Sequence, residues 1–226
     1  MTDFYYNYIK YKHKYINLKN NTNPNYNLLG GALKTIIHIS GPSGAGKTTL
    51  GNKLKYKYDN KIVVKDIDDL RFEFIKKEYP KFKIDKWNPE KYQEYINEFI
   101  KKNNKKPIVF VGLNHMPWLS KRLYYDMHPD HKFYIKLNTK TIFEQKCSRF
   151  IEDVFVKSKE QMLKDIVKDE KTIIKHVINR YKDDCSYEKT QKINEIWNKD
   201  YKLQGYKFLS RDHIFENVCD ILDDVL

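Results

Sequence analysis

The stretch 41–49, with the sequence GPSGAGKTT, constrains the fold of this chain more than any other feature. It fits the phosphate-binding pattern G-x-x-x-x-G-K-[ST] at every defined position. An apolar run over 35–39 precedes it, and a segment with helical character begins at Lys47. Because a loop of this kind joins a strand to a helix, the pattern predicts an α/β domain.

The residue types of this loop suit an anionic ligand. Its glycines allow backbone angles and close approaches that a Cβ would block, so successive N–H groups can point inward around a phosphate. We expect the phosphate-binding residues to be Gly41, Ser43, Gly44, Ala45, Gly46, Lys47, Thr48 and Thr49. Lys47 would reach the β- and γ-phosphates of ATP or another nucleoside triphosphate, and the Thr48 hydroxyl would bind Mg²⁺. A glycine-rich turn without a ligand would explain the glycines but not the Lys-Thr pair at this spacing.

Beyond the loop, strand-like and helix-like segments alternate, which favours a parallel sheet between layers of helices. The expected strands are 35–40, 61–65, 107–111, 131–137 and 206–209. The expected helices are 47–58, 68–79, 89–102, a long region over 140–200 with breaks near 153–158 and 183–187, and a last helix capped by Ser210. These segments predict a three-layer α/β/α architecture with a five-stranded parallel sheet and a helical insertion, or lid, after the fourth strand.

Residues 1–32 differ from the rest of the chain and predict a basic leader and linker, followed by one domain over 33–226. Tyrosine, lysine and asparagine are interspersed over 5–19, which a short basic helix or a partly disordered tail would explain. The sequence YKHKYINLK over 11–19, with Gly30-Gly31 after it, resembles leaders found on many proteins of giant DNA viruses. The leader has no apolar central run, so we do not expect a secretory signal peptide.

The formal net charge of +13 raises the possibility of a nucleic-acid partner. We do not favour it, because lysine, asparagine, tyrosine and isoleucine have AT-rich codons and a biased genome explains the charge as well. Arginine is scarce, with five residues among 43 Lys and Arg. Each arginine is therefore a stronger candidate than any one lysine for bidentate binding of phosphate or carboxylate. Three widely spaced cysteines and the lack of an 18-residue apolar run favour a cytoplasmic protein without a membrane span.

A second charged cluster, with the sequence DIDDLR over 66–71, follows the second predicted strand. A phosphate-binding loop after the first strand, with acidic residues at the carboxyl end of the second, resembles the P-loop kinases of nucleosides, nucleotides and small metabolites. The loop sequence over 40–48 is similar to the loops of guanylate kinases. The pair Asp66-x-Asp68 after the second predicted strand is similar to the pair in shikimate, gluconate and uridine kinases. The third predicted strand ends in VGLN over 111–114 without an aspartate, which disfavours a motor protein or GTPase.

The resemblance implies roles for individual residues, with Lys47, Asp66, Asp68 and Arg149 as the catalytic set. One of Asp66 and Asp68 would orient or deprotonate an acceptor hydroxyl, and the other would contact Mg²⁺ through water. We expect the metal site at Thr48 and Asp66. Arg149 would close on the phosphates as a lid arginine, with Arg180 as a second candidate.

The acceptor would contact Asp68, Arg71, Asn114 and His115, which lie near the carboxyl ends of the second and third predicted strands. Simpler explanations stay open for each of them. Asp68 or Asp69 would suit a helix N-cap, Arg71 a surface salt bridge, and His115 a structural position in a loop.

We therefore expect a phosphotransferase that moves the γ-phosphate of Mg²⁺-ATP to a small acceptor such as a nucleoside, a nucleotide or a related metabolite. A polynucleotide 5′-hydroxyl kinase is one alternative, supported by the net charge of +13. A nucleotide-binding or virion-associated protein without turnover is another, suggested by the leader. The residues leave the acceptor, the choice between ATP and GTP, and the oligomeric state open.

Overall fold

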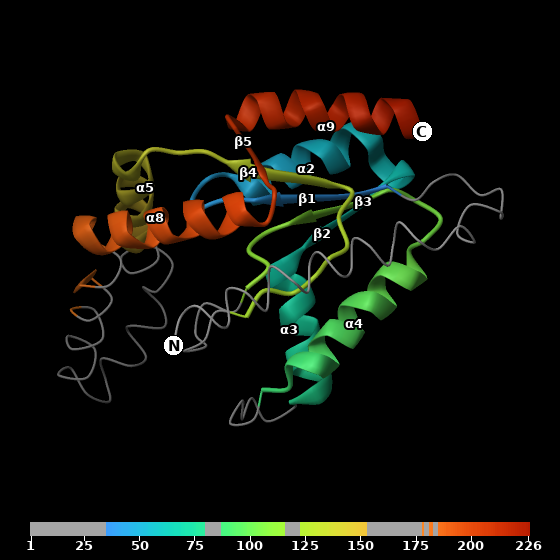
Figure 1. The fold of residues 1–226 in the computed structure, drawn as a ribbon, viewed down its shortest axis with the longest axis horizontal. Helices are drawn as coiled ribbons and strands as arrows, with labels where there is room; N and C mark the ends of the chain where they lie inside the picture. Colours follow the sequence, from blue (N-terminus) through green and yellow to red (C-terminus); the bar gives the residue numbers. More distant parts are fainter. Residues whose placement is uncertain (1–34, 80–86, 116–122, 153–177, 179–180, 183–184) are drawn as a thin grey trace. The chain divides into compact units, whose positions relative to one another are not determined.

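The computed structural model describes residues 35–79, 87–115, 123–152, 178, 181–182 and 185–226 (Figure 1). The chain divides into two compact units, Met1–Leu33 and Lys34–Leu226, and every described residue belongs to the second. The predicted leader over 1–32 and the lid candidate Arg180 lie outside the described residues. Within the described residues, no helix has the length and apolar character needed to cross a membrane.

Five strands form one parallel sheet, which confirms the predicted α/β class and strand number. The strands are β1 (Ile36–Ser40), β2 (Val63–Asp66), β3 (Ile108–Val111), β4 (His131–Ile135) and β5 (Lys207–Leu209). Their order across the sheet is β2-β3-β1-β4-β5. Ile37 of β1 lies opposite both Val109 and His131, so β1 occupies the centre of the sheet.

Six α-helices surround the sheet in the part of the chain that the structure describes. They are α2 (Lys47–Tyr58), α3 (Ile67–Glu78), α4 (Pro89–Lys102), α5 (Thr139–Ile151), α8 (Tyr187–Leu203) and α9 (Arg211–Val225). Two of them start at the expected side-chain caps, because Asn88 accepts from Lys91 N–H and Ser210 accepts from His213 N–H. Helices α5 and α8 fall within the long helical region predicted after the fourth strand.

The cap of α3 is Asp66, rather than Asp68 or Asp69. Strand β2 runs directly into α3 with no linker, so its last residue is also the capping residue. The Asp66 carboxylate accepts a hydrogen bond from Asp68 N–H at 2.9 Å. Asp68 and Asp69 therefore lie in the first turn, where their charges stabilise the positive end of the helix.

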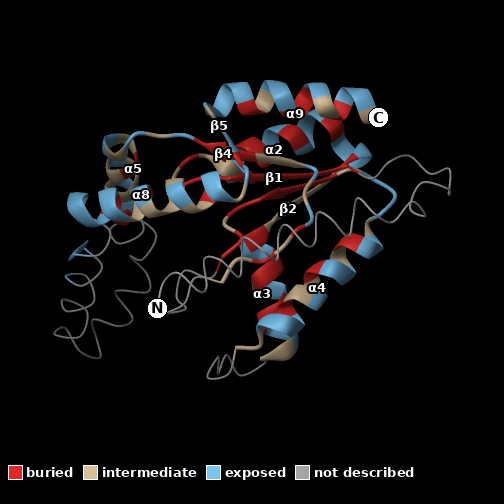
Figure 2. Ribbon diagram, viewed as in Figure 1, coloured by how far each residue is buried: buried red, intermediate tan, exposed pale blue. Residues whose placement is uncertain are grey.

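The two faces of the sheet are covered by different helices (Figures 1 and 2). Alternate residues of β1 point to opposite faces. Ile37 and Ile39 pack in a core with α2 and α9, whereas Ile36 packs in a second core with α3 and α4. A third cluster, formed around Tyr134 and Tyr201, joins α8 to the same face as α3 and α4. Strands β1 and β3 are buried throughout, as expected for parallel strands covered on both faces.

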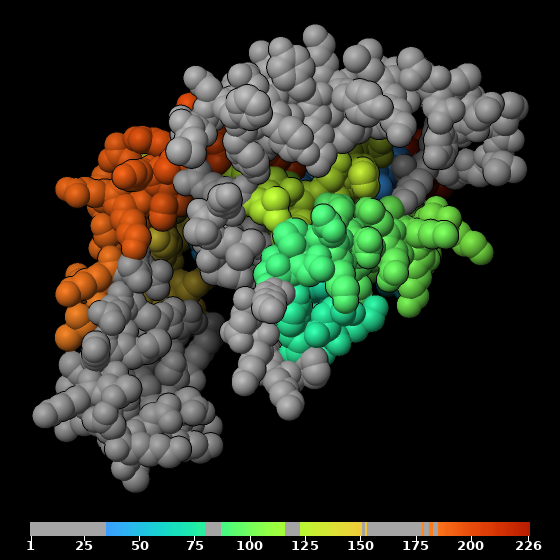
Figure 3. Space-filling view, turned by 60° about the horizontal axis from the view of Figure 1, so that its bottom comes forward, coloured from blue at the N-terminus to red at the C-terminus, as the bar shows by residue number. Residues whose placement is uncertain are grey.

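Helices α3 and α4 pack against each other, and their side chains form one surface in the space-filling view (Figure 3). Phe74 of α3 lies in this interface, with its ring centroid 5.1 Å from that of Tyr92 in α4. Burial of each such side chain stabilises the fold by about 1.5–3 kcal/mol. This core holds α3, and with it the carboxylates of its first turn, at the carboxyl end of β2.

The carboxyl end of β1 is a switch point of the chain. From β1 the chain passes to α2 on one face, whereas the segment that follows β3 packs on the other face through Leu113 and Tyr124. Ligands of open parallel sheets bind at the carboxyl ends of strands where neighbouring connections diverge in this way. The loop over 41–46 lies at this point.

Candidate functional site: a phosphate-binding loop and its neighbours

The loop between β1 and α2 is built from glycines that adopt left-handed backbone angles. Gly44 and Gly46 each have φ of 81°, a value that side chains with a Cβ rarely allow. Ala45 N–H donates to Pro42 O at 3.2 Å and closes the loop. Gly46 is the N-cap of α2 and offers no side-chain cap. The first N–H groups of a helix point toward its N-terminus, which here is the loop. Because no side chain caps α2, these groups can bind an anion.

Lys47 bends back across this loop. Its Nζ donates to Gly41 O at 2.8 Å and to Pro42 O at 2.7 Å. Burial lowers the pKa of Lys47 to about 8; nearby Asp68 and Asp66 oppose this shift, and Arg149 adds to it. An anion bound between Nζ and the loop would favour the protonated lysine.

The Thr48 hydroxyl and the Asp66 carboxylate meet across the gap between α2 and β2. Thr48 Oγ1 donates to Asp66 Oδ2 at 3.0 Å, while Asp66 Oδ1 caps α3. These two residues were predicted as the metal site, and the structure brings them together although they come from different elements. A hydroxyl and a carboxylate oxygen fit Mg²⁺, which proteins hold through one or two carboxylates together with substrate phosphates. No group of three or more His, Cys, Asp or Glu suited to a metal occurs among the described residues.

Asp68 lies in the first turn of α3 and is held by Arg71. Arg71 Nη1 donates to Asp68 Oδ1 at 2.7 Å, and Nη2 donates to Leu113 O and to His115 O, each at 3.1 Å. The Arg71 side chain is only 5% exposed, whereas that of Asp68 is 62% exposed. Arg71 therefore ties α3 to the segment after β3 and fixes a carboxylate that faces solvent. Contact between Arg71 and a substrate stays a prediction.

Asn114 and His115 are buried, and both bind protein groups. Asn114 Nδ2 donates to Tyr125 O at 3.1 Å, and Asn114 Oδ1 accepts from Tyr201 OH at 2.9 Å. The His115 ring lies against Trp197, with 5.4 Å between the ring centroids. These contacts join the segment after β3 to α8, and a contact of either side chain with an acceptor stays a prediction.

Arg149 reaches the loop from α5. Its Nη1 donates to Ser43 Oγ at 3.2 Å, although 106 residues separate the two. The same helix presses Gln145 against the loop, because a Cβ built on Gly44 would lie 2.9 Å from Gln145 Cβ. The structure therefore places the predicted lid arginine beside the phosphate-binding loop.

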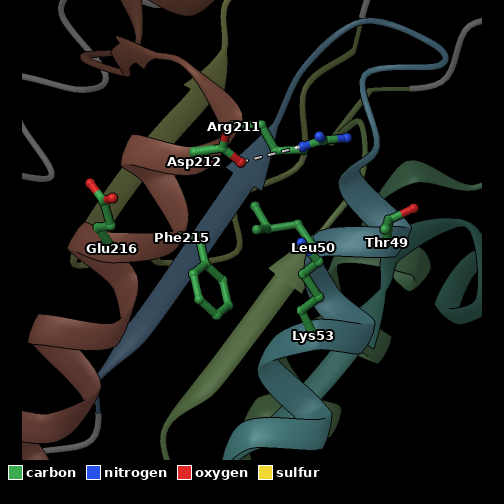
Figure 4. Close-up of a pocket in the computed structure, with 7 residues that line it drawn as sticks. All are labelled: Thr49, Leu50, Lys53, Arg211, Asp212, Phe215 and Glu216. Atoms are coloured by element: carbon green, nitrogen blue, oxygen red, sulfur yellow. Dashed lines mark ion pairs between the residues drawn. The ribbon is translucent and has the colours of Figure 1, made fainter.

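Arg211 is a neighbour of the loop to which we assigned no role from the sequence. It is the first residue of α9, and its Nη1 would lie 3.0 Å from a Cβ built on Gly46. Figure 4 shows its side chain extending from α9 toward the start of α2. It also borders a cavity of about 80 Å³, which is lined further by Thr49, Leu50, Lys53, Asp212, Phe215 and Glu216. The scarcity of arginine makes every arginine of this chain a candidate for phosphate binding, and it is the one signal in the sequence that could have identified Arg211.

A buried histidine, His38 of β1, joins three strands beneath the loop. His38 of β1 contacts Gly112 O through Nε2 at 3.1 Å and the Tyr206 hydroxyl through Nδ1. Burial lowers the pKa of His38 to about 4, so the ring is neutral near pH 7. The neutral ring donates from Nε2 to the carbonyl and accepts at Nδ1 from Tyr206. This pair fixes the end of β3 and the start of β5 against β1.

The loop, the Thr48–Asp66 pair, the Asp68–Arg71 pair and Arg149 thus gather at the carboxyl end of the sheet. Their arrangement suits a triphosphate, a divalent cation and an acceptor beside Asp68. No protein-family model matches this chain, and comparison with curated proteins finds no match.

Proposed function

We propose that this protein is an Mg²⁺-dependent phosphotransferase of the P-loop kinase type, which moves the γ-phosphate of ATP or another nucleoside triphosphate to a small acceptor. The observation that carries the proposal is the 3.0 Å hydrogen bond from Thr48 Oγ1 to Asp66 Oδ2. Thr48 directly follows Lys47 in the chain. It supports a cation site directly beside the residues that would hold the β- and γ-phosphates.

In this proposal Thr48 and Asp66 hold Mg²⁺, which neutralises charge on the β- and γ-phosphates when it is bound. Lys47 Nζ exchanges its bonds with Gly41 O and Pro42 O for phosphate oxygens. Because this site is partly desolvated, the positive charge of Lys47 acts on the transferring phosphoryl group with little screening.

Asp68 orients the acceptor in this scheme, and Arg71 keeps its carboxylate in place. For a hydroxyl acceptor, the acceptor oxygen bonds to the γ-phosphorus, the bond from that phosphorus to the β,γ-bridging oxygen breaks, and Asp68 accepts the hydroxyl proton. For a phosphate acceptor no base is needed, and Asp68 binds the acceptor only. Most of the rate enhancement then comes from positioning and electrostatic stabilisation.

Arg149 completes the proposed site from α5. Its hydrogen bond to Ser43 supports a role for its positive charge at the loop, where it would stabilise charge on the γ-phosphoryl oxygens during transfer. Arg149 belongs to the helices that follow β4, the region for which the sequence predicts a lid.

The test is a γ-phosphate transfer screen with labelled ATP and GTP. Its acceptors are nucleosides, nucleoside monophosphates, sugars and a 5′-hydroxyl oligonucleotide. Lys47→Ala removes the proposed phosphate contact, and Lys55→Ala removes an exposed lysine of the same helix as the matched control. We expect transfer by the wild type and by K55A, and a loss of about 100-fold or more in K47A.

Three results of this screen would speak against the proposal or redirect it. Equal rates for K47A and wild type would overturn it. No transfer to any acceptor, in a protein that binds ATP tightly by calorimetry, would favour a nucleotide-binding protein without turnover. Transfer to the oligonucleotide alone would favour the polynucleotide kinase.

A further inference from the structure

The phosphate-binding loop has two ends that face different parts of a bound triphosphate. The lysine of such a loop reaches the β- and γ-phosphates. Lys47 Nζ lies against Gly41 O and Pro42 O, so the start of the loop is its γ-phosphate end. The opposite end, at Gly46 and Thr49, then faces the α-phosphate.

One arginine lies at each of these ends. Arg149 of α5 contacts Ser43 at the γ-phosphate end. Arg211 of α9 lies at the other end, where its Nη1, Cδ and Cζ would be 3.0, 3.3 and 3.9 Å from a Cβ on Gly46. The guanidinium therefore lies against the loop backbone, in space that is open only because residue 46 is glycine.

The donors of Arg211 are little used within the described part of the chain. Its one partner there is Asp212 Oδ1, at 3.9 Å from Nε, a distance beyond hydrogen-bond range. The two side chains are 49% and 82% exposed, so this pair is weak. A guanidinium has five N–H donors in a fixed fork that matches a phosphate. Arg211 thus lies beside the loop, and the described residues leave its donors available to a ligand.

We propose that Arg211 binds the α-phosphate of the donor nucleotide, so that the two arginines clamp the polyphosphate from both ends of the loop. This inference rests on the proposed function, because it assumes that the loop binds a nucleoside triphosphate. It gives α9 a part in binding the donor nucleotide. Arg211 binds the α-phosphate, which ATP and ADP share, whereas Arg149 binds the γ-phosphate, which only ATP carries.

The test compares binding of ATP, ADP and inorganic tripolyphosphate by calorimetry in wild type, Arg211→Ala and Arg149→Ala. Because charge-assisted hydrogen bonds to phosphate are strong, we expect R211A to weaken binding of all three by about tenfold or more, with ATP and ADP affected equally. R149A should weaken ATP more than ADP. Arg211→Gln repeats the test with a longer polar side chain, should R211A fail to fold.

Asp212→Asn is the matched control, because it removes the partner of Arg211 and leaves the guanidinium in place. We expect D212N to bind all three ligands as the wild type does. Wild-type affinity of both Arg211 variants would overturn the inference while leaving the proposed function intact. Weakened binding of ATP and ADP with unchanged binding of tripolyphosphate would also overturn it, because Arg211 would then contact the nucleoside. A wild-type protein that binds none of the three would overturn the proposed function itself.

Discussion

Replacing Gly44 by alanine should destabilise the protein and loosen α5 from the phosphate-binding loop. Two effects add at this position. The φ of 81° costs a residue with a Cβ about 1–2 kcal/mol. The new Cβ would also lie 2.9 Å from Gln145 Cβ, an atom fixed to the α5 backbone that no rotamer change can move. Overpacking of this kind costs about 1–3 kcal/mol, so we expect a total of about 2–5 kcal/mol.

The chain offers a matched control for this substitution in Gly205. Gly205 has the same φ of 81°, but a Cβ there would have no neighbour within 4 Å. Gly205→Ala therefore reports the backbone term alone, about 1–2 kcal/mol. Both substitutions restrict the unfolded chain in the same way, so that contribution cancels in the comparison.

The assay is equilibrium unfolding in urea, with ATP and ADP binding measured on the same samples. We expect G44A to be less stable than G205A by about 1–3 kcal/mol, the contribution of the α5 contact. Because a displaced α5 moves Arg149, G44A should also lose part of the preference for ATP over ADP. Equal free energies of unfolding for the two variants would refute the packing of α5 on the loop.

Three shorter predictions follow from other contacts. Thr48→Val should lower the apparent Mg²⁺ affinity in ATP binding by about tenfold or more, because it removes the hydroxyl. Thr48→Ser keeps the hydroxyl and should keep the wild-type Mg²⁺ affinity. Equal Mg²⁺ titrations of the two variants would contradict the metal role. Lys47 has a pKa of about 8 in the protein without ligand, and bound phosphate favours its protonated form. Calorimetry should therefore show ATP affinity falling by up to about tenfold per pH unit above pH 8. An ATP affinity that does not change with pH would contradict this. The His38 pKa falls from 6.5 to about 4 on folding, so stability should rise by up to about 3 kcal/mol between pH 4 and 6.5. Urea unfolding should show a smaller rise in His38→Gln, and an identical rise would contradict the assignment.

Much of the fold could be predicted from the sequence because its signals are local. The strands at the centre of the sheet are short apolar runs, and Asn88 and Ser210 mark helix starts by their type and position. The cap of α3 was harder to predict, because three aspartates stand close together and only the end of β2 decides which of them caps.

The site was predictable from the residues alone only where one segment carries it, whereas Asp66 and Arg149 were assigned through the resemblance to P-loop kinases. The loop is contiguous, so its residues were found from the pattern alone. The contacts of Ser43 with Arg149 and of Gly46 with Arg211 join segments far apart in the chain, and they depend on the placement of α5 and α9. The sequence does not specify such placement in any local pattern.

The burial of Arg71 had a signal that was available in the sequence. It follows Ile67 by four positions and precedes Phe74 by three, so a helix over this region places it on the apolar face. A charged residue on that face requires fixed partners, and Arg71 has them in Asp68 and two backbone carbonyls. Helical spacing therefore favoured a buried position for Arg71 over the surface salt bridge considered as an alternative.

The most direct test of the central claim is ATP binding in the presence of Mg²⁺, measured by calorimetry in wild type, Lys47→Ala and Lys55→Ala. If the loop over 41–49 is a triphosphate site, the wild type and K55A should bind ATP with the same affinity, and K47A should bind it about 10–100-fold more weakly. Wild-type affinity in K47A, or no ATP binding by the wild type, would contradict the claim.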